Sequence, residues 1–214
     1  MAISVKICGV RTPEIGLAAA RAGADYIGVV FVKSSPRAMD PDAAPAFARD
    51  LRAACAKADV AAPKTVALHV DPDPAALAAT APFVDAVQLH GAETPGEVAA
   101  VRRAYGLPTI KAIGVAGRDD VARAGSFDAD VILFDAPKGG SGAGFDWNHL
   151  AAYDGDAPFF LAGGLSPATV GAAVAAARAH PKFAGVDVSS GVERARGEKD
   201  AGLIADFVAA ARAA

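Results

Sequence analysis

Eight short apolar runs alternate with eight helical stretches and predict an α/β protein, a single (β/α)₈ TIM barrel over residues 1–214. The apolar runs show little polar alternation, as is typical of strands buried on both faces of a parallel sheet. Regular alternation of strand and helix favours such a sheet, and eight units of about 25 residues suit a closed barrel. A doubly wound open sheet is the alternative, but no glycine fingerprint follows the first strand.

The elements follow in order along the chain. Helix starts are marked by a capping residue before proline, at Thr12-Pro13, Asp40-Pro41, Thr94-Pro95 and Ser166-Pro167. Alanine-rich stretches such as 205–214 are expected to be helices, because alanine has the best helix propensity. The expected strands are 3–8, 26–31, 65–70, 86–89, 109–113, 131–134, 159–162 and 185–188. The expected helices are 12–22, 42–58, 73–81, 94–105, 118–125, 146–153, 167–179 and 199–213.

Composition narrows the class of protein. At 53% hydrophobic residues the chain can bury a large core, and its net charge of −3 gives no reason to expect nucleic acid or an anionic membrane as partner. Cys8 and Cys55 form neither a disulfide framework nor a metal motif, which favours a reducing, cytoplasmic compartment. The N-terminus lacks the pattern of a signal peptide, and no stretch approaches the length of a membrane span.

Small residues follow the last two strands. In a parallel barrel all strand ends meet on one face, and the loops after strands 7 and 8 often bind phosphate. LAGGLSP places Gly163 and Gly164 there, and VDVSSGVE places Ser189, Ser190 and Gly191 beside them. Exposed backbone N–H groups favour an anion, so a phosphorylated small molecule is the expected ligand.

The segment 128–147, DADVILFDAPKGGSGAGFDW, holds the first catalytic candidate. Its strand ends at Asp135, and a carboxyl at a partly desolvated mouth can keep its proton and act as an acid. Cys8 ends the first strand, and a partly ionised thiol can accept a proton from carbon. This pair suits the isomerisation of a phosphorylated sugar. A glycine-rich loop follows the acid, at positions 139, 140, 142 and 144.

Simpler interpretations accompany these candidates. A lone cysteine at a strand end is usually a small apolar residue, and an aspartate there often caps a helix, as we expect of Asp146. Arg37 can bind a carboxylate with both arms of its guanidinium, but in isolation it reads as a solvated loop charge. His90 is expected to line the pocket, with a structural role as the alternative. Asp187 is expected to orient the last phosphate loop.

Taken together, the motifs KICGV (6–10), FVKSSPR (31–37), VQLHGAE (87–93), LFDAPKGGSGAGFDW (133–147), LAGGLSP (161–167) and DVSSGVE (187–193) resemble those of phosphoribosylanthranilate isomerase, over nearly the whole chain. The resemblance implies that Cys8 is the general base, that Asp135 is the general acid, and that Arg37 binds the anthranilate carboxylate. The loops at 163–164 and 189–191 would hold the phosphate. Two residues depart from the family pattern: His69 replaces a common aromatic residue, and Arg196 replaces a common proline.

The implied reaction is the Amadori rearrangement of N-(5-phosphoribosyl)anthranilate in tryptophan biosynthesis. It needs no metal and no organic cofactor, because the iminium nitrogen formed on ring opening serves as the electron sink. We expect a monomer, with a homodimer as the alternative.

The sequence also bears on several alternative functions. A dual-substrate isomerase of histidine biosynthesis would carry aspartate where Cys8 stands and would show two phosphate sites. A metal-dependent epimerase would need more histidine ligands than His69 and His90 supply at strand ends. A non-catalytic phosphate-binding barrel, or a scaffold partner in a pathway complex, would not need both Cys8 and Asp135. Another phosphate-binding synthase stays open as a further alternative.

Overall fold

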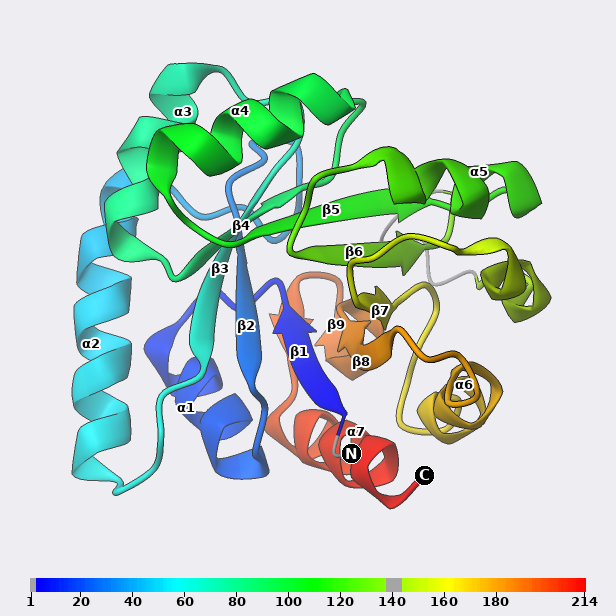
Figure 1. The fold of residues 1–214 in the computed structure, drawn as a ribbon. Coiled ribbons are helices and arrows are strands. Elements are labelled where there is room, and N and C mark those ends of the chain that lie inside the picture. The colour runs from blue at the N-terminus through cyan, green and yellow to red at the C-terminus, as the bar shows by residue number, and fades with distance from the viewer. Residues whose placement is uncertain (1–2, 138–143) are drawn as a thin grey trace.

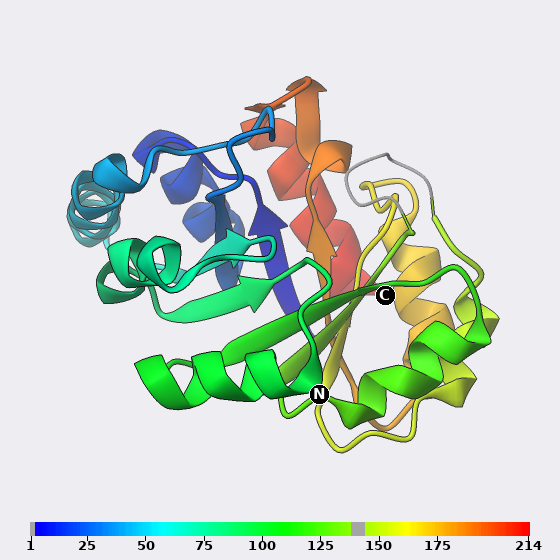
Figure 2. The same cartoon turned by 90° about the horizontal axis from the view of Figure 1, so that it is seen from above.

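The computed structural model describes residues 3–137 and 144–214, and in it the strands β1 to β8 form a closed parallel barrel in sequential order (Figure 1). Closure occurs where β1 pairs with β8, with Lys6 opposite Asp187. The helices surround the strands when the molecule is seen from above (Figure 2). The predicted fold class is confirmed. The glycines at 139, 140 and 142 lie outside the described residues.

The strands lie where the apolar runs predict them, with ends that differ by at most two residues. Asp135 is the last residue of β6 rather than the first residue after it. The strands are β1 (Ser4–Cys8), β2 (Tyr26–Val30), β3 (Lys64–His69), β4 (Ala86–Leu89), β5 (Thr109–Gly114), β6 (Val131–Asp135), β7 (Phe159–Leu161) and β8 (Phe183–Val188).

Side-chain caps start several of the helices. The Thr12 hydroxyl accepts a hydrogen bond from the N–H of Ile15, and Thr94 forms a capping box with Glu97. At the other end of the chain, α7 packs against α1 where the barrel closes (Figure 1). The α-helices are α1 (Pro13–Ala22), α2 (Ala44–Lys57), α3 (Pro74–Thr80), α4 (Pro95–Tyr105), α5 (Arg118–Arg123), α6 (Val170–Ala177) and α7 (Ala201–Ala213).

Three features correct the expected layout. The helix start predicted at Ser166-Pro167 is wrong, because α6 begins at Val170 with Thr169 at its N-cap. The connection predicted as an α-helix at 146–153 is a 3₁₀ helix, Trp147–Ala152, although Asp146 caps it as expected by accepting from the N–H of Asn148. A hairpin that the sequence analysis did not predict follows β8, formed by β9 (Glu193–Ala195) and β10 (Glu198–Lys199). This hairpin contributes to the site described below.

Two apolar layers place the cavity at one end of the barrel. One cluster packs between the strands and the surrounding helices, and includes Ile7, Phe134 and Phe207. A smaller cluster, with Ile110 and Phe160 among its members, comes from the alternate positions on β3 to β7, which face the barrel axis. This inner cluster fills the barrel interior, and the cavity lined by Cys8 and Asp135 opens above it at the C-terminal ends of the strands. Among the described residues, no helix combines the length and apolar character that crossing a bilayer requires.

Candidate active site

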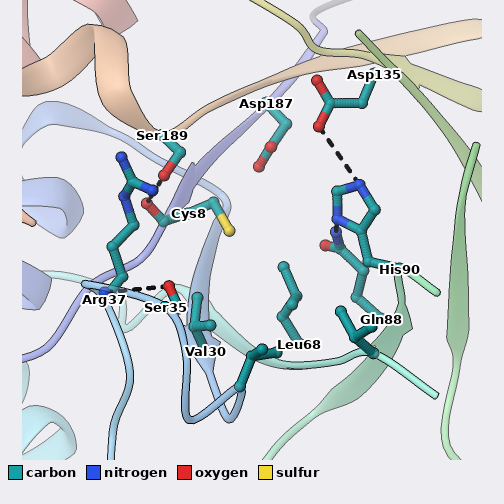
Figure 3. A pocket seen from close by; sticks show the side chains of 12 residues that line it. Cys8, Val30, Ser35, Arg37, Leu68, Gln88, His90, Asp135, Asp187 and Ser189 are labelled. Atoms are coloured by element: carbon teal, nitrogen blue, oxygen red, sulfur yellow. Dashed lines mark hydrogen bonds and ion pairs between the residues drawn. The ribbon is translucent and has the colours of Figure 1, made fainter. Parts of the chain in front are cut away.

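A cavity of about 260 Å³ opens at the C-terminal ends of the strands (Figure 3). It brings together six of the residues that the sequence analysis singled out, from β1, β6, β8 and the loops that follow β2, β4 and β8. Apolar side chains form the remaining wall, together with two polar residues. Its lining is Cys8, Val30, Val32, Ser35, Arg37, Leu68, Val70, Gln88, His90, Asp135, Asp187 and Ser189.

Cys8 ends β1, which pairs with β8, the strand that carries Asp187, and its sulfur points into the cavity (Figure 3). Burial raises the pKa of the Cys8 thiol, and the nearby Lys6 ammonium opposes that rise. Asp187 adds a smaller contribution that raises the pKa further. The two charged neighbours therefore shift the pKa of Cys8 in opposite directions, and Lys6 has the stronger effect.

Asp135 presents its carboxyl to the same cavity. One oxygen, Oδ1, accepts a hydrogen bond of 2.7 Å from the N–H of Ala136, and the other lies 3.4 Å from Nε2 of His90. Burial, and then the charge of Asp187, raise the pKa of Asp135 to about 6. A carboxyl with this pKa keeps its proton closer to neutral pH than an exposed aspartate does, which suits a general acid.

His90 stands beside the acid as a neutral ring, because burial lowers its pKa to about 4. Its Nδ1 lies 3.3 Å from Nε2 of Gln88, so Gln88 and Asp135 contact the ring from opposite sides. The Gln88 Oε1 atom is buried without a hydrogen-bond partner among the described residues. The sequence analysis missed Gln88, although a polar residue within the apolar strand AVQL was the available signal.

A second, smaller hollow of about 30 Å³ adjoins the main cavity and shares Asp135, Asp187 and Ser189 with it. The predicted phosphate residues Gly163, Gly164 and Ser190 line it. Both glycines have positive φ, at 84° and 65°, which side-chain-bearing residues rarely adopt.

Gly191, also predicted to bind phosphate, is not among the residues that line these two cavities. A Cβ at this position would overlap the carbonyl oxygen of Leu165, so the loops after β7 and β8 approach one another too closely for a side chain. Ser189 donates from its hydroxyl to the carbonyl oxygen of Cys8 at 3.1 Å, which ties the last loop to the first strand. Asp187 lies within β8 and pairs with Lys6 on β1 at 2.7 Å.

Arg37 lines the main cavity, but its guanidinium is already held by a carboxylate. Nε and Nη2 donate to Glu193 at 2.6 and 2.9 Å, and Lys199 donates to the same carboxylate at 2.7 Å. Burial alone would raise the pKa of Glu193, but these hydrogen bonds lower it to about 2. Arg37 is therefore a fixed, nearly buried cation rather than a solvated loop charge.

The sequence analysis missed three charged residues of this site: Lys6, Glu193 and Lys199. Lys6 could have been recognised, because it lies two residues before Cys8 on the same face of a buried strand. Glu193 and Lys199 fall in a charged segment, ERARGEK, that reads as an exposed turn. Within the ranges 3–137 and 144–214, no group of three or more His, Cys, Asp or Glu side chains could hold a metal ion.

Comparisons with known proteins identify the family of this chain. The profile of the N-(5'phosphoribosyl)anthranilate (PRA) isomerase family matches residues 5–210. N-(5'-phosphoribosyl)anthranilate isomerases from Rhodopseudomonas palustris and Paracoccus denitrificans are 45% and 46% identical to this chain. The alignments cover 100% of this chain and 100% and 99% of those proteins.

Solved structures extend the similarity to three dimensions. A crystal structure of phosphoribosyl anthranilate isomerase in complex with reduced 1-(o-carboxyphenylamino)-1-deoxyribulose 5-phosphate has a TM-score of 0.79 at 30% identity, covering 99% of this chain and 100% of that one. The isomerase from Thermotoga maritima has a TM-score of 0.81 at 30% identity, with the same coverage. Profile, full-length identity and fold all agree, and the chain belongs to the phosphoribosylanthranilate isomerase family.

Proposed function

We propose that Cys8 and Asp135 act as base and acid in the isomerisation of N-(5'-phosphoribosyl)anthranilate, the reaction of this family. The observation that carries the proposal is that thiol and carboxyl line one cavity, with a small glycine- and serine-lined hollow beside it. An acid and a base on separate walls can act on neighbouring atoms of one bound substrate.

The acid acts first in this scheme. Asp135 gives its proton to the furanose ring oxygen as the C1'–O bond breaks, and the nitrogen lone pair forms the C=N bond of the open-chain iminium. The pKa near 6 makes the proton available close to neutral pH. The N–H of Ala136 then stabilises the carboxylate that remains.

The base acts second. The Cys8 thiolate takes the proton from C2', and the electrons of that C–H bond move toward the iminium nitrogen to give an enolamine. Tautomerisation, with loss of the enol O–H proton and protonation of C1', yields the ketone. Each acid–base role is worth roughly a hundredfold to ten-thousandfold in rate.

The binding residues hold the two ends of the substrate. Gly163, Gly164 and the serines of the last loop would receive the phosphate, and Arg37 would receive the anthranilate carboxylate. Glu193 engages two of the five guanidinium donors of Arg37. Among the described residues no other side chain accepts from this guanidinium, so its remaining donors can bind the substrate carboxylate while the arginine is held in place.

A fluorescence assay tests the proposal, with phosphoribosylanthranilate generated in situ. The wild-type protein should consume it, and both Cys8→Ala and Asp135→Asn should lose turnover while still binding the reduced product analogue. Cys55→Ala is the matched control, because Cys55 is buried in α2. Retained turnover in either site variant contradicts the role assigned to that residue.

We also propose a single-domain, monomeric, cytoplasmic enzyme. The free thiols of Cys8 and Cys55 are consistent with a reducing compartment. The isomerase of Thermotoga maritima is described as dimeric. Light scattering on the purified protein tests the oligomeric state, and the mass of a homodimer would contradict the proposed monomer.

A further inference from the structure

The buried ammonium of Lys6 lies beneath the proposed base. Lys6 is 0% exposed, and its Nζ donates to Oδ1 of Asp187 at 2.7 Å across the closing strand pair. Lys6 and Cys8 alternate along β1 with outward-facing Ile7, so both side chains point toward the barrel axis. An ammonium so far from water is rarely retained without a partner that needs its charge.

Gly28 shows how closely the thiol and the ammonium approach. Gly28 pairs with Cys8 in the β1–β2 register. A Cβ at Gly28 would lie 2.8 Å from the sulfur of Cys8 and 3.2 Å from Nζ of Lys6. Both head groups therefore converge on the space above one glycine, and the absence of a side chain there allows them to do so.

We propose that Lys6 is a positioning residue for the base and stabilises the thiolate form of Cys8 that removes the substrate proton. This inference rests on the proposed role of Cys8. The inner apolar cluster fills the barrel below, so little water screens the attraction between ammonium and thiolate. Asp187 accepts one of the three N–H donors of the Lys6 ammonium, so the other two can point toward a thiolate sulfur.

Other charged groups around the thiol do not replace Lys6. Lys199 also faces Cys8, but it donates to Glu193 and to the carbonyl and hydroxyl oxygens of Ser189. Asp187 acts in the opposite direction and favours the neutral thiol. Asp135 and His90 line the same cavity, and burial favours the neutral state of both. Of the nearby cations, Lys6 is therefore the one whose removal should raise the pKa of Cys8 most.

The experiment measures the pKa of Cys8 from the pH dependence of its alkylation by iodoacetamide, without substrate, in a Cys55→Ala background. Lys6→Met should raise the thiol pKa by about one unit or more, so that alkylation in the rising limb slows about tenfold. Lys6→Arg keeps the charge and should leave the thiol pKa within a few tenths of the wild-type value. Asp187→Asn should lower the thiol pKa, because it removes a negative charge and releases the Lys6 ammonium.

Each outcome decides the inference. An unchanged thiol pKa in folded Lys6→Met overturns it, and so does an equal rise in Lys6→Met and Lys6→Arg, which would indicate a packing role. If Lys6→Met does not fold, an unchanged or raised thiol pKa in Asp187→Asn overturns it instead. The proposed function fails separately, if the Cys55→Ala protein does not consume phosphoribosylanthranilate, and the thiol titration is independent of that result.

Discussion

Replacing Glu193 by glutamine should destabilise the protein substantially, because one carboxylate holds two nearly buried cations. The exposed side-chain fractions are 5% for Glu193, 11% for Arg37 and 2% for Lys199. The carboxylate accepts from both cations and from the N–H of Gly197 at 3.0 Å. Removing one partner of a buried ion pair costs roughly 3–5 kcal/mol, since the remaining charge is left uncompensated. We expect a loss of about 3 kcal/mol, a large fraction of the 5–15 kcal/mol that stabilises a typical domain.

Urea unfolding at pH 7.5 measures this loss through the fluorescence of Trp147, the one tryptophan of the chain. Glu198→Gln is the matched control in the same hairpin. Its pair with Arg194 is exposed, at 57% and 69% of the two side chains, and exposed pairs contribute at most about 1 kcal/mol. If Glu193→Gln and Glu198→Gln unfold at the same urea concentration, the Arg37–Glu193–Lys199 network is not a stabilising element.

The same variant has a pH signature. The pKa of Glu193 is lowered to about 2 in the folded protein, against about 4.3 in an unfolded chain. Its contribution to stability is therefore complete above the unfolded value and is lost as the pH falls toward 2. The difference in unfolding free energy between wild type and Glu193→Gln should narrow over that range, and a difference that stays constant contradicts the argument.

Three further predictions concern other buried charges. Asp135→Asn should lose roughly a hundredfold to ten-thousandfold in turnover. The same variant should unfold at a higher urea concentration than the wild type at pH 7, because the raised pKa of Asp135 shows that its carboxylate is costly to bury. A variant that is less stable than the wild type contradicts this. Burial lowers the pKa of His69 to about 4, and its ring is hydrogen-bonded to Thr80. Because the unfolded chain binds this proton from about pH 6.5, the free energy of unfolding should decrease as the pH falls from about 6.5 to 4. His69→Phe should reduce that slope in acid titrations followed by circular dichroism, and an unchanged slope would assign it to other groups. Lys111→Met leaves the buried Glu93 carboxylate without its cation and should cost roughly 3 kcal/mol in urea unfolding. Wild-type stability of this variant would contradict a stabilising role for the pair.

The strand ends were the predictable part of the site. A parallel barrel places every C-terminal strand end on one face, so Cys8 and Asp135 were expected to meet there on topology alone. The structure places both on one cavity. Gly163 and Gly164 were predictable for the same reason, because the loop after β7 must lie on the face where the C-terminal strand ends meet.

The charge network was not predictable from local pattern. Glu193 and Arg37 are 156 residues apart, and nothing in either neighbourhood indicates the other. The segment that contains Glu193 alternates charge and small residues, which is typical of a solvated turn. Only the fold shows that it makes a hairpin packed against the loop after β2. The 3₁₀ helix at Trp147–Ala152 was predicted as an α-helix, because the pattern of so short a segment does not distinguish the two kinds of helix.

The Lys6–Asp187 ion pair affects the pKa values of both proposed catalytic groups, Cys8 and Asp135. The proposed mechanism needs a working form in which Asp135 is protonated and Cys8 is ionised. Because the thiol has the higher pKa, this form is less populated than the form of equal charge in which Asp135 is ionised and Cys8 is neutral. Lys6 is the largest charge effect on Cys8 and lowers its pKa, while Asp187 is the largest on Asp135 and raises its pKa. The pair thus brings the two pKa values closer together. Since the ratio of the two forms depends on the difference between these pKa values, each unit of narrowing enriches the working form about tenfold. A neutral ion pair can increase catalysis in this way without changing the net charge of the site.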